Sequence, residues 1–297
     1  MKKEARNCMR GDYTRTDLAC EAGRPEAERK EEIVYPIKGH EGLRLLRCRE
    51  ETGERYVTLF TGRVTLLGED MLSAVGELLG RELFRMATGL LGHAPGGNTV
   101  VLVAGLGNSD MTADALGPGT VRRLTVTRHL KVHDEAMYRS LGCCELAAIA
   151  PGVLGQTGIE TGELVRGAID HVRPDLVVAV DALAARNCDR LAATVQLTDQ
   201  GIAPGAGIGN FRLPMDRETM GCPVLGLGIP TVVDSATLIY DALEKAGMTS
   251  PVPSALEAVL ENGRSFVVSP KDSDCITEIS CRLLAKAIDH AFGVGVL

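Results

Sequence analysis

Two aspartates carry side chains that could do chemistry, and each follows a predicted strand. Asp114 lies in the loop after an apolar run that ends near Gly105, and Asp181 follows the apolar run 176–180. In an open α/β sheet the carboxyl ends of parallel strands meet at one edge, so both carboxylates are expected close together there. In such a pair one carboxylate can take a proton from water while its protonated neighbour polarises a peptide carbonyl. The pattern is therefore compatible with peptide hydrolysis.

A structural role is also compatible with these positions. An aspartate after a strand often caps the next helix by accepting hydrogen bonds from its free backbone N–H groups. Asp110, four residues before Asp114, is a rival for the first carboxylate. Gly105, Gly107 and Asn108 lie in the same loop. These three residues are expected to support the site, with Asn108 and the loop N–H groups holding a carbonyl oxygen as negative charge develops on it.

Other patterns are weaker. His129 and His133 stand four residues apart, which on a helix would place both imidazoles on one face, where they could bind a metal. Cys143 and Cys144 have no evident base near them in the sequence, which favours buried structural cysteines over a nucleophile. The glycine-rich stretch 205–210 could form a backbone cradle, although such stretches are more often turns. The chain has neither a P-loop nor a complete dinucleotide fingerprint, which disfavours ATP and NAD chemistry.

An alternation of strands and helices is expected to position these residues. Short continuous apolar runs precede small or polar residues, as in strands covered on both faces. Stretches with three- and four-residue apolar spacing predict helices between and after them. The sequence therefore predicts one main α/β domain with a mostly parallel sheet flanked by helices. The predicted strands lie in 98–108, 174–185 and 222–234, and the predicted helices in 72–90, 161–173, 234–247 and 273–292.

A β-rich addition is expected before this alternation. Residues 42–61 contain two β-prone runs on either side of the polar turn 50–54. Alternating, β-prone runs around a short polar turn are typical of a hairpin or meander. The N-terminal part of the chain is therefore predicted to add antiparallel strands to the α/β core.

Composition excludes several classes of protein. The chain has 297 residues, a net charge of −7, nine cysteines, five Phe, five Tyr and no Trp. This length can bury a full core without disulfides, so reduced cysteines are expected. An acidic chain with few aromatic rings is poorly suited to bind nucleic acid. No apolar run is long enough to span a bilayer, and no signal-peptide pattern follows the charged start. We therefore expect a cytoplasmic protein without direct nucleic-acid or membrane binding.

Six stretches, taken together, resemble the germination protease family, the spore endopeptidases of spore-forming bacteria. The resemblance extends from about Arg15 to the C-terminal helix. It implies a core similar to that of hydrogenase-maturation endopeptidases and an endopeptidase that degrades small acid-soluble spore proteins during germination. It also implies a zymogen that assembles as a homotetramer in the forespore or spore core. The stretches are 105–118, 125–130, 150–161, 175–187, 196–210 and 223–234.

The resemblance also implies a processing site. Family members cut after Glu or Asp and before a hydrophobic residue followed by Ala, a pattern that Asp17, Leu18 and Ala19 match. A removable leader at residues 1–17 and a protease domain at residues 18–297 are therefore expected. The chain would then contain a sequence like that of its own substrates.

The resemblance further matches Asp114 and Asp181 to the family's favoured catalytic aspartates. Two alternatives stay open. A metal-dependent endopeptidase is one, because the family has been classified both as aspartic and as metal-dependent. No metal or other cofactor is assigned, and His129 and His133 are the weak candidates for metal ligands. A non-enzymatic α/β binding module is the other, and it would explain the strands and helices but not the site at Asp17 and Leu18.

Overall fold

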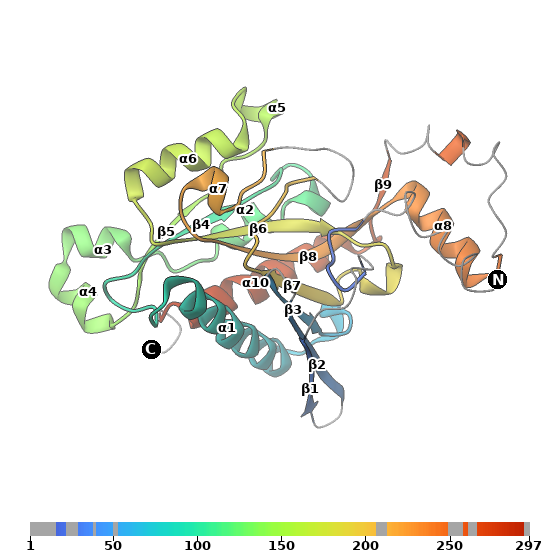
Figure 1. Cartoon of the computed structure of the whole chain (residues 1–297), viewed down its shortest axis with the longest axis horizontal. Helices are drawn as coiled ribbons and strands as arrows, with labels where there is room; N and C mark the ends of the chain where they lie inside the picture. Colours follow the sequence, from blue (N-terminus) through green and yellow to red (C-terminus); the bar gives the residue numbers. More distant parts are fainter. Residues whose placement is uncertain are drawn as a thin grey trace.

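One mixed sheet forms the centre of the molecule (Figure 1). The computed structural model describes residues 16–21, 29–37, 40–49, 53–205, 213–248, 258–260 and 266–293. Within these residues the strand order is β1-β2-β3-β7-β8-β6-β4-β5, and β9 pairs with β8. The strands are β1 (Arg29–Ile37), β2 (His40–Arg49), β3 (Arg55–Phe60), β4 (Val100–Gly105), β5 (Glu145–Ile149), β6 (Leu176–Ala184), β7 (Thr194–Thr198), β8 (Val224–Asp234) and β9 (Val267–Val268).

The predicted α/β fold is confirmed, but parallel pairing is confined to part of the sheet. Strands β8, β6, β4 and β5 are parallel to one another, whereas β1, β2, β3, β7 and β8 pair antiparallel along the sheet. The core strands are parallel as expected, and β2 and β3 form the expected β-rich addition, whereas the antiparallel pairing of β7 with β8 was not expected. Short connections between β1, β2 and β3 favour antiparallel pairing there, and the predicted β-rich addition joins the same sheet through β3 and β7.

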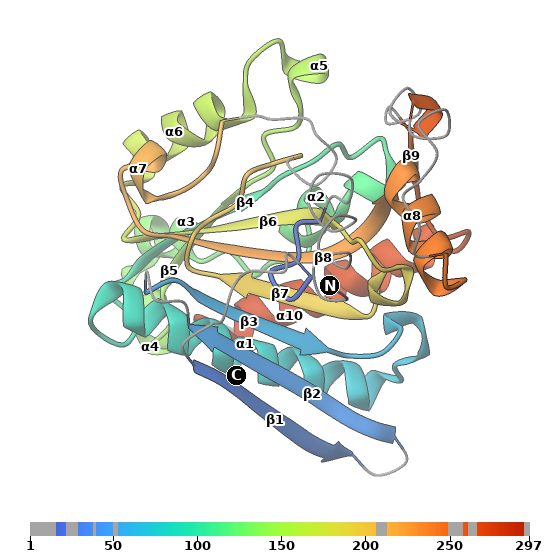
Figure 2. The ribbon, with the colours of Figure 1, turned by 45° about the vertical axis from the view of Figure 1, so that its right-hand side comes forward.

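Helices cover both faces of the sheet (Figure 2). Each of the four predicted helices is present. α1 ends at Gly92, whose left-handed φ of 77° suits a residue without a side chain. α8 begins after Asp234, whose carboxylate accepts a hydrogen bond from the Thr237 N–H. The helices are α1 (Glu69–Leu91), α2 (Leu116–Val121), α3 (Arg128–His133), α4 (Glu135–Leu141), α5 (Leu154–Thr157), α6 (Thr161–Val172), α7 (Arg217–Met220), α8 (Ser235–Lys245) and α10 (Ser273–Ala291), with 3-10 turns η1 (Val64–Leu66), η2 (Thr112–Asp114) and η3 (Cys188–Arg190).

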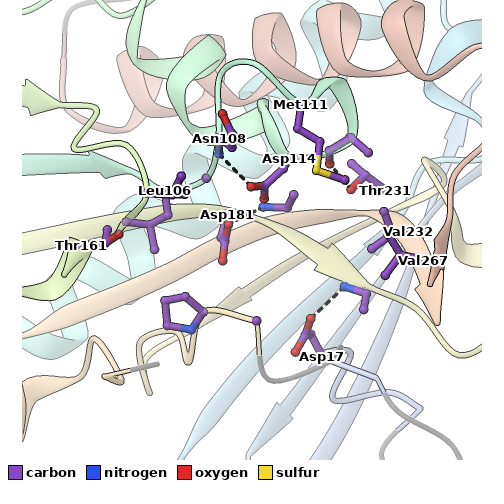
Figure 3. A pocket seen from close by; sticks show the side chains of 17 residues that line it. Asp17, Leu106, Asn108, Met111, Asp114, Thr161, Asp181, Thr231, Val232 and Val267 are labelled. Carbon is purple, nitrogen blue, oxygen red and sulfur yellow. Dashed lines mark hydrogen bonds between the residues drawn. The ribbon is translucent and has the colours of Figure 1, made fainter. Parts of the chain in front are cut away.

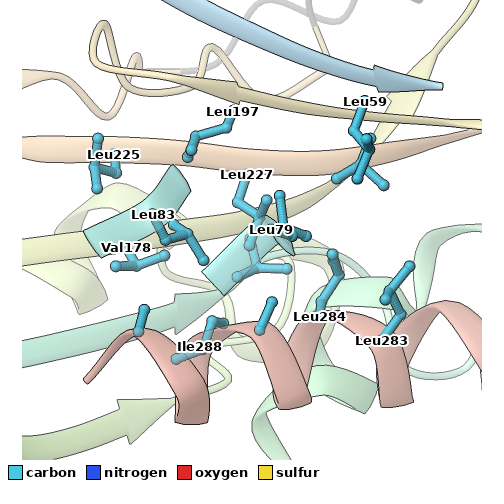
Figure 4. Close-up of a cluster of buried hydrophobic side chains, with 14 of the residues drawn as sticks. Leu59, Leu79, Leu83, Val178, Leu197, Leu225, Leu227, Leu283, Leu284 and Ile288 are labelled. Carbon is cyan, nitrogen blue, oxygen red and sulfur yellow. The ribbon is translucent and has the colours of Figure 1, made fainter. Parts of the chain in front are cut away.

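The main core lies between the sheet and the pair α1 and α10 (Figure 4). A smaller apolar cluster lies on the other face, between the sheet and α6 and α7. Side chains alternate between these faces along each strand. In β6, Val178 and Val180 enter the α1–α10 core, while Val177 and Ala179 enter the cluster under α6. In the described part of the chain, no helix is both long and apolar enough to cross a membrane.

Candidate active site

Asp181 lies inside a strand rather than after one. β6 continues to Ala184 because β8 runs beside it past this point, with Asp181 opposite Gly228. Since Val180 enters the α1–α10 core, Asp181 points to the opposite face, and only 5% of it is exposed. Its Oδ1 accepts a hydrogen bond of 2.9 Å from the Ala182 N–H. The strand boundary expected from the apolar run was therefore too early.

Asp114 ends the 3-10 turn that follows β4. Its Oδ2 accepts a 2.8 Å hydrogen bond from the backbone N–H of Asn108. Gly107 makes this approach possible, because its φ is 111° and a Cβ there would lie 2.1 Å from the Asp114 carbonyl oxygen. Gly105 allows a second close approach, since its Cβ would lie 2.3 Å from the carbonyl oxygen of Gly117 in α2. The two glycines therefore support the site through backbone packing.

Two buried threonines, which sequence reasoning did not select as site residues, anchor this turn. The Thr231 hydroxyl donates a 2.6 Å hydrogen bond to the Ala113 carbonyl, and the Thr277 hydroxyl donates one of 2.9 Å to the Thr112 carbonyl. Thr231 is the extra residue of a bulge where the pairing of β8 with β6 shifts. A bulge redirects a side chain. Its place near a strand end was a usable signal, whereas nothing local marks Thr277 on α10.

Asp114 and Asp181 line one cavity of about 290 Å³ (Figure 3). Asp17 lines it as well, although it lies far from both aspartates in the sequence. The two carboxylates that the sheet-edge argument expected close together thus line the same cavity. The larger side chains of the cavity wall include Leu106, Asn108, Met111, Val153, Thr161, Pro204, Thr231, Val232 and Val267.

A second cavity of about 290 Å³ shares Asp17 and Asp181 with the first. It lies over β8, where Gly226 and Gly228 form part of its wall. Their neighbours in the strand, including Leu227, enter the α1–α10 core, so the glycines occupy the opposite face. Because they carry no side chains, Gly201 packs closely on Gly226 and Leu183 on Gly228, where a Cβ would lie only 2.5 Å and 2.6 Å from its neighbours. The two cavities together form a groove past Asp181.

The segment Thr16–Glu21 is docked beside this groove, with Thr16 and Asp17 forming part of its wall. The Asp17 N–H donates to the Ala184 carbonyl at 2.9 Å, and the Ala184 N–H donates to the Asp17 carboxylate at 2.8 Å. The Gln196 amide binds the same segment twice: its nitrogen donates to the Asp17 carbonyl at 2.8 Å, and its oxygen accepts from the Ala19 N–H at 2.6 Å. Residues 1–15 of the expected leader lie outside the described residues.

The side chains that follow Asp17 are also held. Leu18 is fully buried in a small apolar cluster. The Glu21 carboxylate accepts hydrogen bonds from the backbone N–H groups of Arg186 at 2.7 Å and Asn187 at 3.0 Å. The other buried members of the Leu18 cluster are Leu183, Ala185 and Val233.

Two predicted loop residues are placed differently from expectation. The Asn108 amide oxygen accepts hydrogen bonds from the Asp110 N–H and the Gln156 amide, and its backbone N–H is bound to Asp114. The backbone N–H of Asn108 therefore holds the Asp114 carboxylate in place, and its amide oxygen joins the loop to Gln156. Asp110 is exposed and binds Gln156 outside the cavity wall. Of the glycine-rich stretch, Gly205 lines the cavity, and residues 206–210 lie outside the described residues.

The remaining candidates lie elsewhere. His129 and His133 are exposed on α3, away from the cavity wall. Across the described ranges, no group of three or more His, Cys, Asp or Glu side chains is placed to hold a metal ion. Cys143 and Cys144 are buried, and burial raises the pKa of the Cys144 thiol to about 12. A thiolate is disfavoured there, which fits a structural role.

Comparison with known proteins identifies the family. The family model described as germination protease matches residues 45–246. A germination protease of Clostridium acetobutylicum is 34% identical over 93% of this chain and 94% of its own, and one of Caldanaerobacter subterraneus subsp. tengcongensis is 33% identical over 95% of each. Among solved structures, the NiFe hydrogenase maturation protease HycI of Thermococcus kodakarensis KOD1 matches 50% of this chain and 90% of its own, with 20% identity and a TM-score of 0.31. The chain therefore belongs to the germination protease family of endopeptidases.

Proposed function

We propose that this protein is a self-processing endopeptidase that uses Asp114 and Asp181 to activate water. Its substrates are small acid-soluble spore proteins, which it cuts during germination after Glu or Asp and before a hydrophobic residue followed by Ala. One observation carries the proposal. The two carboxylates line a cavity that also holds Asp17, the acidic residue of a segment with that cleavage pattern.

The chemistry needs two carboxylates in different protonation states. The ionised one takes a proton from water, and the protonated one donates to the carbonyl under attack. Asp114 is held by the Asn108 N–H, and Asp181 by the strand in which it lies. Both are therefore fixed before substrate arrives, which lowers the cost of aligning water with the peptide.

The docked segment supports the cleavage pattern residue by residue. The acidic side chain of Asp17 meets a backbone N–H donor at Ala184, and the hydrophobic side chain of Leu18 fills an apolar cluster. We accordingly place the processing site between Asp17 and Leu18. Residues 1–17 are then the leader, and residues 18–297 are the mature protease domain.

The family resemblance extends the proposal to the oligomeric state of the protein and its location in the cell. The protein is a homotetramer that acts in the forespore or spore core. Light scattering on the purified protein measures the assembly directly. A monomer at micromolar concentration would contradict this part without affecting the proposed chemistry.

Replacement of each aspartate by Asn tests the proposal. Full-length D114N and D181N should lose about 10²–10⁴-fold in the rate of leader removal and of cleavage of acid-soluble spore proteins. Mass spectrometry of the new N-terminus at Leu18 follows the first reaction. D110N is the matched control, since Asp110 is exposed outside the cavity wall, and it should keep its activity.

Full activity of D114N or D181N would remove that residue from the mechanism. Loss of activity in D110N would instead favour Asp110 as a catalytic carboxylate. Complete inhibition by a chelator, reversed by added metal, would support the metal-dependent alternative. An intact chain that cuts no spore protein would favour the binding module.

A further inference from the structure

The Gln196 side chain spans the proposed scissile bond. Its amide nitrogen donates to the carbonyl oxygen of Asp17, before the bond, at 2.8 Å. Its amide oxygen accepts from the N–H of Ala19, after the bond, at 2.6 Å. Only 6% of Gln196 is exposed. One buried side chain thus fixes the backbone on both sides of the bond between Asp17 and Leu18.

Its place in β7 directs the Gln196 side chain toward the bond between Asp17 and Leu18. In β7, Val195 and Leu197 enter the α1–α10 core, so Gln196 points to the opposite face, where Asp181 also points. Pairing of β7, β8 and β6 places Gln196, Gly228 and Asp181 in one row across the three strands. Two strand spacings, about 10 Å, separate the outer two backbones. A Cβ at Gly228 would lie 2.6 Å from the Leu183 side chain, so the strand between the two polar residues needs glycine at this position.

We infer that Gln196 is a further catalytic residue, one that holds the carbonyl oxygen of the bond being cut and stabilises the negative charge that forms on it. This inference rests on the proposed function, since it requires cleavage between Asp17 and Leu18. The same two hydrogen bonds can be made to the backbone of an acid-soluble spore protein once the leader segment has left. They recognise main-chain groups, so they position any substrate that enters in the same extended form.

The reaction balances without any change to Gln196. The water oxygen forms a bond to the carbonyl carbon of Asp17, and the electron pair of the C=O π bond moves onto the oxygen held by the Gln196 N–H. One aspartate takes a proton from the water. The C–N bond then breaks, the Leu18 nitrogen takes that proton, and the carbonyl re-forms. The products are the carboxyl group of Asp17 and the amine of Leu18. A donor aimed at the developing oxyanion lowers the barrier.

The first measurement is the rate of leader removal in full-length Q196A. Loss of one oxyanion donor should slow cleavage about 10²–10³-fold. Cleavage of acid-soluble spore proteins in trans should lose more in kcat than in KM, because charge develops on the oxygen only during attack. T194V is the matched control. Thr194 is buried on β7 two residues from Gln196, and its hydroxyl has no hydrogen-bond partner among the described residues, so T194V should keep wild-type rates.

Q196E separates catalysis from folding. The introduced carboxylate can still accept from the Ala19 N–H but cannot donate to the Asp17 carbonyl, so Q196E should be as slow as Q196A at neutral pH. Once protonated, it regains a donor. Asp17, Tyr56 and Asp181 are the titratable side chains that line the same cavity, and the carboxylates of Asp17 and Asp181 favour this protonation. The rate of Q196E relative to wild type should therefore rise as the pH falls, while that of Q196A stays flat.

The outcomes distinguish this inference from the proposed function. Cleavage by Q196A within about threefold of wild type, with D114N and D181N inactive, would overturn the role of Gln196 and leave the proposed function standing. A ratio of Q196E to wild-type rates that does not change with pH would also overturn the role of Gln196 as a hydrogen-bond donor. A wild-type chain that never cuts between Asp17 and Leu18 would overturn both. Slow cleavage by Q196A at wild-type thermal stability, with partial recovery of Q196E at low pH, would support the inference.

Discussion

The loop of Asp114 and the segment Thr16–Glu21 both bring a carboxylate to the same cavity, but they are held in opposite ways. The loop is held by close backbone approaches that Gly105 and Gly107 permit, together with threonine hydroxyls from β8 and α10. The segment is held by one buried leucine, the amide of Gln196 and the backbone of β6.

This difference matches two different tasks. Backbone contacts without intervening side chains leave the loop little freedom, which suits the proposed role of Asp114 in catalysis. Contacts made to the main chain and one apolar side chain of the segment can be exchanged for those of another chain with similar residues. Under the proposed function, the groove would hold the leader once and substrates many times.

The largest effect is expected from a change at Gly107, which tests whether close backbone packing holds the loop of Asp114. A G107A variant needs a Cβ 2.1 Å from the Asp114 carbonyl oxygen, at a φ of 111°. The turn must move, and a displacement of about 1 Å can cost roughly 100-fold in rate. We expect leader removal to slow by at least about 100-fold, as measured by mass spectrometry.

G53A is the matched control, because Gly53 has a φ of 92° but open space around its missing Cβ. It should cost about 1–2 kcal/mol of unfolding free energy from backbone strain, without a specific loss of cleavage. Equal losses of activity in the two variants would mean that strain, and not the position of Asp114, decides the rate.

A smaller effect is expected from L18A, which weakens the docked segment. Leu18 is fully buried, and large-to-small changes at such sites cost about 2–5 kcal/mol. If that cost falls on docking, the docked population drops by about 30-fold or more, and leader removal slows with it. Hydrogen exchange of residues 16–21 in a D181N background measures the docking without cleavage.

L66A serves as the control for L18A, since 75% of Leu66 is exposed. It should leave both exchange and cleavage unchanged. If residues 16–21 remain protected from exchange in L18A, then the apolar cluster does not hold the segment and the comparison must be revised.

The smallest effect should come from T231V, which removes one hydrogen bond from the loop and keeps the side-chain shape. A single buried hydrogen bond contributes about 0.5–1.5 kcal/mol, and the Ala113 carbonyl would lose its partner. We expect a drop of that size in unfolding free energy and a loss of cleavage of roughly tenfold or less. T231S keeps the hydroxyl and should restore most of the rate. A loss as large as that of G107A would show that Thr231 does more than anchor the turn.

Local patterns in the sequence were sufficient for many elements. The three- and four-residue spacing of apolar side chains predicted α1, and Gly92 marked its end. The continuous apolar runs predicted β4, β6 and β8, and the sheet-edge rule selected Asp114 and Asp181. These features depend on residues near one another in the chain, where burial on one face dictates the spacing.

The tertiary structure decided what depends on distant segments. Asp181 lies within β6 because β8 extends the pairing, and the antiparallel half of the sheet depends on which strands meet across long connections. Gln196 resembles any polar residue in a short strand until the segment around Asp17, well over 100 residues earlier, docks against it. The sequence by itself determined the faces of the elements and the candidate carboxylates. Register and docking determined which side chains meet, because those choices depend on the packing of the whole chain.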